Sequence, residues 1–179
     1  MAYTPDFTKA PAQILIDLIN SANSASLVTA LTPELVTFGA PVAQAGNANG
    51  DTNITMTAAA GSGYSGNVSL NYNRVPMSSI PGAKSTVYTQ GSATKISDLI
   101  PEINATYGIN LTADDYEDAA LPVFPNQPHD SLPFTITAKS TSLVWEGSLT
   151  LTLDNNDVPL TSVITTLNLP GLVYTAPTA

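Results

Sequence analysis

The sequence contains no cysteine, which excludes disulfides and thiolate metal sites. This absence argues against a small secreted domain held together by disulfides. No apolar run approaches the roughly 18 residues that a membrane-spanning helix needs. The first residues also lack the charged start and apolar run of a secretory signal. We therefore expect a soluble protein made inside a cell.

Charged residues are scarce, at 11% of the chain against roughly 25% in ordinary soluble domains. The five Lys and Arg residues are scattered singly, and fourteen Asp and Glu residues bring the net charge to −9. This balance argues against direct binding to nucleic acid or to an anionic membrane. The polar surface must come from Ser, Thr, Asn and Gln. Such a surface suits a protein packed against other proteins, and the alternative is a β-rich domain with ordinary Thr-rich strands.

Catalytic motifs are also missing: the chain has no GxSxG, no GxxxxGK[ST] and no HExxH. His129 is the single histidine and lies in a Pro-rich stretch. We expect it at the surface or partly packed, because no nucleophile can be paired with it. The sequence therefore predicts no enzymatic activity, no catalytic residue and no cofactor.

Three polar clusters are the candidates for a metal site. Residues 114–118 (DDYED) could bind a cation, but acidic residues at a helix start also interact favourably with the helix dipole. Residues 47–51 (NANGD) resemble part of a calcium loop without its bidentate Glu, and residues 154–157 (DNND) are typical of a turn. We predict no metal site, with a cation at one of these clusters as the alternative.

An internal repeat is what the chain does contain. The segment 97–112 (SDLIPEINATYGINLT) has an earlier counterpart at 15–28 (LIDLINSANSASLV). Five residues recur at one constant spacing: Leu15, Ile16, Ile19, Asn20 and Leu27 correspond to Leu99, Ile100, Ile103, Asn104 and Leu111. The apolar residues of each segment fall at helical spacing and form one stripe. Each repeat is thus expected to begin with an amphipathic helix.

The expected strands recur in the same order. ITMTA at 54–58 matches ITA at 136–138, and GNVSLNYN at 66–73 matches GSLTLTLDN at 147–155. VPMSSI at 75–80 matches VPLTSV at 158–163. The closing strand of the first repeat, 85–89, is echoed by PGLVYT at 170–175. Thr- and Val-rich strands resemble one another by chance, but the shared order disfavours that explanation.

These patterns predict the α+β class, with a β-rich chain built as a tandem duplication. Each unit is a helix plus an antiparallel sheet, the first in residues 1–92 and the second in residues 93–179. We expect two similar lobes.

Single residues also predict the helix ends and the places of the aromatic side chains. Thr8 and Ser97 are the expected N-caps of the two helices, and Gly108 is the expected residue after the second helix. We expect Trp145 in the core. A carbohydrate-binding or adhesion module is an alternative function, since the chain offers these aromatic residues as platforms: Tyr64, Tyr72, Tyr88, Tyr107, Tyr116, Trp145 and Tyr174.

The segment 100–118 (IPEINATYGINLTADDYED) resembles a pattern of structural proteins from large tailed bacteriophages, IN-x-x-YG-x-x-LT-x-x-D. The first repeat departs from it, with Asn23 and Ser24 where Tyr107 and Gly108 stand. The resemblance implies a particle component. We therefore expect a structural virion protein made in the host cytoplasm, most simply a capsid decoration or cement protein.

A tail, collar or baseplate component is the alternative within the same class. The expected partners are major capsid or tail proteins, with the chain homo-oligomeric or bound to the particle lattice.

Overall fold

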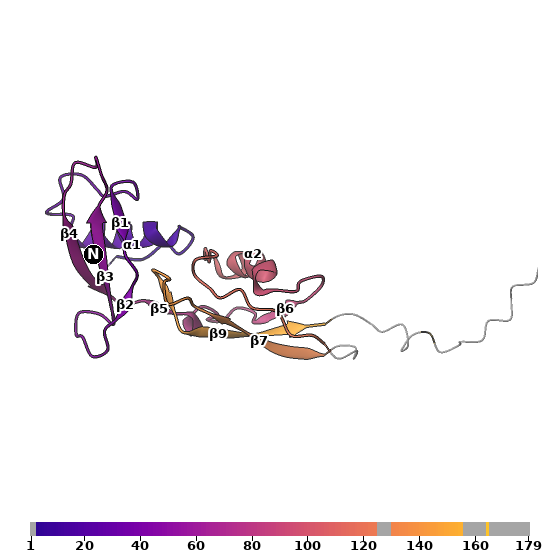
Figure 1. The fold of residues 1–179 in the computed structure, drawn as a ribbon. Coiled ribbons are helices and arrows are strands. Elements are labelled where there is room, and N and C mark those ends of the chain that lie inside the picture. Colours follow the sequence, from indigo (N-terminus) through magenta and orange to yellow (C-terminus); the bar gives the residue numbers. More distant parts are fainter. Residues whose placement is uncertain (1–2, 125–129, 156–163, 165–179) are drawn as a thin grey trace, which may run out of the picture.

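A computed structural model describes residues 3–124, 130–155 and 164 of the chain. The fold is α+β and mostly β, as the sequence predicts. The described residues form two α-helices, α1 (Pro11–Ala22) and α2 (Ile96–Tyr107). They also form three sheets (Figure 1), from β1 (Val36–Phe38), β2 (Val42–Ala43), β3 (Thr52–Ala58), β4 (Asn67–Tyr72), β5 (Val75–Pro76), β6 (Val87–Thr89), β7 (Ser131–Thr137), β8 (Trp145–Glu146) and β9 (Ser148–Asp154).

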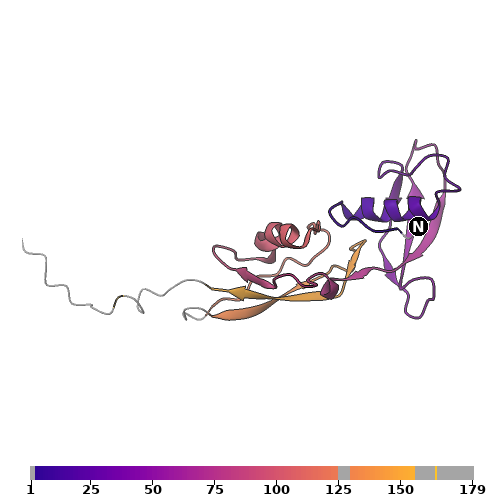
Figure 2. The ribbon, with the colours of Figure 1, turned by 180° about the vertical axis from the view of Figure 1, so that it is seen from behind.

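The N-terminal sheet has β3 at its centre, with β4 on one side and both β1 and β2 on the other, all antiparallel. Helix α1 lies beside this sheet (Figure 2). Its stripe of Leu15, Ile16 and Ile19 is buried against Val36 and Ile54 of the sheet. Burying one such side chain contributes about 1.5–3 kcal/mol. Packing of this apolar face therefore holds the helix in place, since α1 has no side-chain cap.

The C-terminal sheet has the order β6-β9-β7, with β9 antiparallel to β7 and parallel to β6. Helix α2 covers it (Figure 1), and Leu99, Ile100 and Ile103 share one core with Leu149 and Leu151. A short parallel pair, β5 with β8, connects the two halves of the chain. The sequence predicted an antiparallel sheet, and this prediction is wrong for the C-terminal sheet because β6 and β9 are parallel.

Strand β6 does not close the first sheet, as the sequence pattern suggested, but pairs with β9 of the second. The physical reason is the ring of Tyr88, which is 3% exposed and makes edge contacts with Tyr107 and Phe134 of the C-terminal core. The chain reaches that core directly after β4, because the Val75 N–H donates to the Val144 carbonyl at 2.7 Å.

The two predicted N-caps, Thr8 and Ser97, were wrong. The N-cap of α1 is Ala10, and the Thr8 hydroxyl donates instead to Asp6. The N-cap of α2 is Lys95, which leaves Ser97 inside the first turn. Gly108 does follow α2 with a φ of 67°, a left-handed conformation that glycine adopts at low cost.

Two asparagines, one on each helix, make the same pair of hydrogen bonds. The Asn20 amide accepts from the Leu31 N–H at 2.8 Å and donates to the Leu31 carbonyl at 2.9 Å. The Asn104 amide does the same with Leu111, at 2.9 and 3.0 Å. In these hydrogen bonds Leu31, not the predicted Leu27, has the role that Leu111 has beside α2.

The hairpins also agree in register. The Ala58 N–H donates to the Gly66 carbonyl at 3.0 Å, and the Ala138 N–H donates to the Gly147 carbonyl at 2.9 Å. Both glycines have a positive φ, 83° and 70°. From these positions β4 pairs along β3, and β9 along β7, in the same alternation. The repeat matches at 158–163 and 170–175 lie outside the described residues.

Candidate functional site

The acidic cluster at 114–118 is used within the fold. Asp115 is 1% exposed, and its carboxylate accepts the Thr112 N–H and hydroxyl at 2.9 and 2.8 Å. Its second oxygen accepts the Ser142 hydroxyl at 2.7 Å. The Ser142 hydroxyl oxygen in turn accepts the main-chain N–H of Trp145. A carboxylate engaged by three donors is satisfied without a cation.

Two further carboxylates of this region hold the start of α2. Asp118 accepts the Ser97 N–H at 2.9 Å, and the Lys95 ammonium lies 3.8 Å from it. Asp98 accepts the main-chain N–H groups of Thr94 and Lys95 at 2.8 and 3.0 Å. These bonds, first the one from Thr94, lower the pKa of Asp98. Both residues therefore satisfy amide groups at a helix N-terminus.

The cluster at 47–51 is also internally bonded. The Asn47 amide donates to the Gln44 side chain at 2.7 Å, and its oxygen accepts the Asn49 N–H. Asp51 accepts the Thr52 hydroxyl and the Arg74 N–H. Within the part of the chain that the structure describes, no three His, Cys, Asp or Glu residues lie close enough to hold a metal ion. Nor does a helix there have the length and apolar character to cross a bilayer.

His129, Asn156, Asp157 and Tyr174 lie outside the described residues. Trp145 is in the core as predicted, at 2% exposed and in ring contact with Phe7. Tyr88, Tyr107 and Tyr116 are buried as well. Tyr64 is 42% exposed, so it alone of these four tyrosines presents its ring to solvent.

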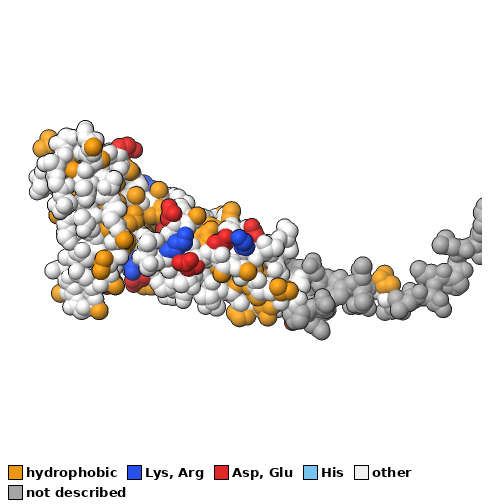
Figure 3. All heavy atoms as spheres, viewed as in Figure 1, with side chains coloured by type: hydrophobic (Ala, Val, Ile, Leu, Met, Phe, Trp, Pro, Cys, Tyr) orange, Lys and Arg blue, Asp and Glu red, His pale blue; other side chains and the backbone are white. Residues whose placement is uncertain are grey.

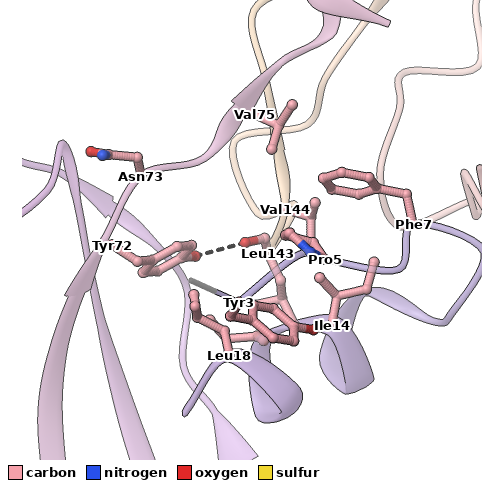
Figure 4. Close-up of a pocket in the computed structure, with 11 residues that line it drawn as sticks. Tyr3, Pro5, Phe7, Ile14, Leu18, Tyr72, Asn73, Val75, Leu143 and Val144 are labelled. Atoms are coloured by element: carbon pink, nitrogen blue, oxygen red, sulfur yellow. Dashed lines mark hydrogen bonds between the residues drawn. The ribbon is translucent and has the colours of Figure 1, made fainter. Parts of the chain in front are cut away.

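A small cavity lies where the two halves of the chain meet (Figure 4). It is enclosed by residues of the N-terminal segment, α1, the end of β4, β5 and the stretch before β8: Tyr3, Pro5, Phe7, Ile14, Leu15, Leu18, Tyr72, Asn73, Val75, Leu143 and Val144. Its volume is about 60 Å³, far below the roughly 300 Å³ of a small-molecule site. The cavity is therefore a packing feature of the junction.

Polar contacts cross the same junction. The Tyr72 hydroxyl donates to the Leu143 carbonyl at 2.7 Å, the bond drawn in Figure 4. Burial raises the pKa of Tyr72 to about 12. Arg74 donates to the Thr52 hydroxyl and lies 3.6 Å from the carboxylate of Glu146. The junction thus joins the two sheets by specific bonds as well as by apolar packing.

The outer side of β4 is an exposed surface with apolar side chains. Within the described residues β4 pairs only with β3, which leaves its other edge open. Val68 is 44% exposed there, although the sequence pattern placed it on a half-buried face. Beside it lies a cavity of about 200 Å³ lined mostly by apolar side chains: Leu27, Leu31, Val36, Met56, Ala58, Tyr64, Ser65, Gly66, Asn67 and Val68. We call this cavity and the edge from Tyr64 to Asn73 the β4 edge surface.

The β4 edge surface carries no charge. Residues 64–73 (YSGNVSLNYN) include no Asp, Glu, Lys or Arg. In Figure 3 charged atoms gather over the middle of the visible face, while the N-terminal sheet is mainly hydrophobic or neutral. Natural sheets commonly protect open edges with Lys, Pro or a covering segment. No described residue pairs with this uncharged edge, which makes it a candidate site for an added polypeptide strand.

The alternation of Val68, Leu70 and Tyr72 with polar residues is typical of a strand with one buried face, so the sequence does not reveal this surface. One signal was present in the sequence. In the sequence match, Leu149 corresponds to Val68 and Trp145 corresponds to Tyr64. The first segment therefore has the smaller or more polar side chain at both positions.

A family model described as a family of unknown function, DUF7941, matches residues 5–179. No curated protein and no solved structure matches the chain.

Proposed function

Since this chain belongs to the DUF7941 family, whose function is unknown, we propose from its own residues that it is a structural protein of a bacteriophage particle. In this proposal the chain is a tandem duplication of a helix-plus-sheet unit, with repeats 1–92 and 93–179. Its role is to bind other proteins, and it catalyses no reaction.

The observation that carries the duplication is the repeated hydrogen-bond framework. Asn20 with Leu31 and Asn104 with Leu111 make equivalent bonds on the two helices. Farther along, the Ala59 N–H donates to the Leu35 carbonyl, and the Lys139 N–H donates to the Asp115 carbonyl, both at 2.9 Å. Equivalent bonds at equivalent sequence positions support a common origin for the two units.

The role in a particle is supported by the resemblance of residues 100–118 and by what the polar residues do. The acidic side chains that suggested a metal site bind main-chain N–H groups and hydroxyls. The β4 edge surface offers unpaired backbone groups and an apolar cavity. Two linked lobes that bind equivalent positions on a lattice would gain avidity of about 10²–10⁴ over one lobe. A capsid decoration or cement protein fits these properties best.

Mass spectrometry of purified particles tests the proposal. We expect the chain in the particle, at a copy number that follows the lattice of the capsid shell. Particles made without the gene should lack density at those positions in images. A low copy number set by the symmetry of the tail would move the proposal to a tail, collar or baseplate component. Absence of the chain from purified particles would overturn it.

A further inference from the structure

We propose that the C-terminal segment of one copy of this chain, residues 158–175, binds the β4 edge surface of a second copy and so links copies head to tail. The inference rests on the duplication proposed above, and it names the partner of that surface. The equivalent surface of the C-terminal sheet is occupied by another part of the same chain.

On the C-terminal sheet the outer edge of β9 is covered by the segment 75–89. Strand β6 pairs there in parallel: Thr152 donates its N–H to the Thr86 carbonyl at 2.8 Å, and the Gln90 N–H donates to the Asp154 carbonyl at 3.0 Å. Met77, in the short 3-10 helix Met77–Ser79, is fully buried in the same core as Ile136 and Leu149. The last part of the first repeat therefore completes the second sheet.

On the N-terminal sheet no described strand pairs at the corresponding places. The Ala58–Gly66 bond fixes the alternation along β4, so the main-chain groups of Asn71 and Asn73 point away from β3. They correspond to Thr152 and Asp154, which bind β6 in the other sheet. Val68 is 44% exposed, whereas its counterpart Leu149 is 3% exposed.

The cavity of the β4 edge surface lies where Met77 packs in the other unit. Its lining residues Leu31, Met56 and Val68 correspond to Leu111, Ile136 and Leu149, which are buried in one cluster with Met77. The cavity of about 200 Å³ is thus the place of a missing apolar side chain.

The sequence of the C-terminal segment supplies the missing parts in the right order. VPLTSV at 158–163 repeats VPMSSI at 75–80, which places Leu160 at the position of Met77. PGLVYT at 170–175 ends in the same VYT as strand β6. Residues 158–179 contain no charged side chain, which matches the uncharged edge of β4. Strand addition to an open edge is a common mode of peptide recognition.

The chain's own β4 is out of reach for Val158, the start of this segment. Strand β9 leads away from the N-terminal sheet (Figures 1 and 2), and its seven residues span roughly 20 Å. Val158 follows Asp154 by four residues, a reach of at most about 14 Å. The segment therefore meets the N-terminal sheet of another copy. Such a heterologous contact produces a ring when the rotation closes, and an open filament when it does not.

Disulfide mapping on the full-length chain tests this arrangement, and the absence of native cysteine makes it specific. By analogy with the Thr152–Val87 pair, Asn71 should lie opposite Val173. We expect a mixture of the single variants Asn71→Cys and Val173→Cys to form a disulfide-linked heterodimer. Asn71→Cys mixed with Thr165→Cys is the matched control and should form far less of it.

In a variant that carries both Asn71→Cys and Val173→Cys, a cross-link confined to single chains would overturn the head-to-tail arrangement. Equal yields in the two mixtures, at the highest concentration at which the protein stays soluble, would also overturn it.

Self-association without a cross-link provides a second test of the same proposal. Sedimentation of the full-length chain should show self-association that Leu160→Asp abolishes and Thr165→Asp preserves, because the two variants add the same charge to the same segment. Self-association equal in both variants would contradict the proposal. Failure of this head-to-tail proposal can be told apart from failure of the proposed function. If only the head-to-tail proposal fails, the chain is found in particles but its copies do not cross-link there.

Discussion

The hydroxyl of Tyr72, at the end of β4, donates a 2.7 Å hydrogen bond to the main-chain carbonyl of Leu143, which precedes β8. This bond ties the N-terminal sheet to the C-terminal half of the chain. It lies beside the apolar cavity of the junction (Figure 4).

Replacing Tyr72 with Phe should destabilise the protein by about 1 kcal/mol, because the Leu143 carbonyl loses its donor while the ring stays in place. Chemical denaturation measures this change. The control is Tyr64→Phe, since the Tyr64 hydroxyl makes a longer, exposed contact of 3.4 Å with the Thr29 carbonyl. Equal effects of the two variants would contradict a structural role for the junction bond.

Alkaline pH should destabilise the protein through the same residue. Burial raises the pKa of Tyr72 to about 12, above its ordinary value of about 10. The folded protein therefore keeps the phenol proton where the unfolded chain has lost it. This contribution to stability is complete below about pH 10 and is lost as pH rises toward 12. Unfolding free energies measured across that window should fall less steeply for Tyr72→Phe, and an unchanged slope would contradict the assignment.

The hydrogen bonds of Asn20 with Leu31 and of Asn104 with Leu111 should contribute similarly to the free energy of unfolding. Asn20→Ala and Asn104→Ala each remove a donor and an acceptor from a leucine backbone, so each should cost about 1–3 kcal/mol. Chemical denaturation of both variants measures this change. The control is Asn49→Ala, which changes an exposed loop residue. If one substitution is neutral and the other costly, the two positions are not equivalent in the fold.

Asp115→Asn should destabilise the protein by about 1–3 kcal/mol, because an amide NH₂ would face hydroxyl or N–H donors in a buried site. Thermal melting of this variant is compared with Asp114→Asn, which changes an exposed neighbour. The same melting experiment with added Ca²⁺ should give no shift. A rise in stability with Ca²⁺ that Asp115→Asn removes would restore the metal-site alternative.

The helices and hairpins could be predicted from the sequence because their signals are local. The apolar stripes around Ile16 and Ile100 define the helices, and the alternation before and after Gly147 defines a hairpin. The glycine after α2 could be predicted, but the N-caps could not, since the N–H of Ser97 is bonded by Asp118, which lies far along the chain. Strand β6 was recognised, but its partner β9 was not, because a strand's sequence does not say which of two sheets it joins.

Nor could the candidate site be predicted. Exposure of Val68 depends on whether a segment covers β4, and sequence alternation alone indicates a buried face.

The parallel pairing of β6 with β9 has a consequence for synthesis on the ribosome. The N-terminal sheet is complete once Tyr72 has emerged, and it can fold at that point. Strand β6 emerges soon afterwards but has to wait for residues 148–154 before it finds its partner. During that interval the ring of Tyr88 is a transiently exposed apolar group, so the C-terminal half of this protein is the part that a chaperone or a slow translation rate would affect most.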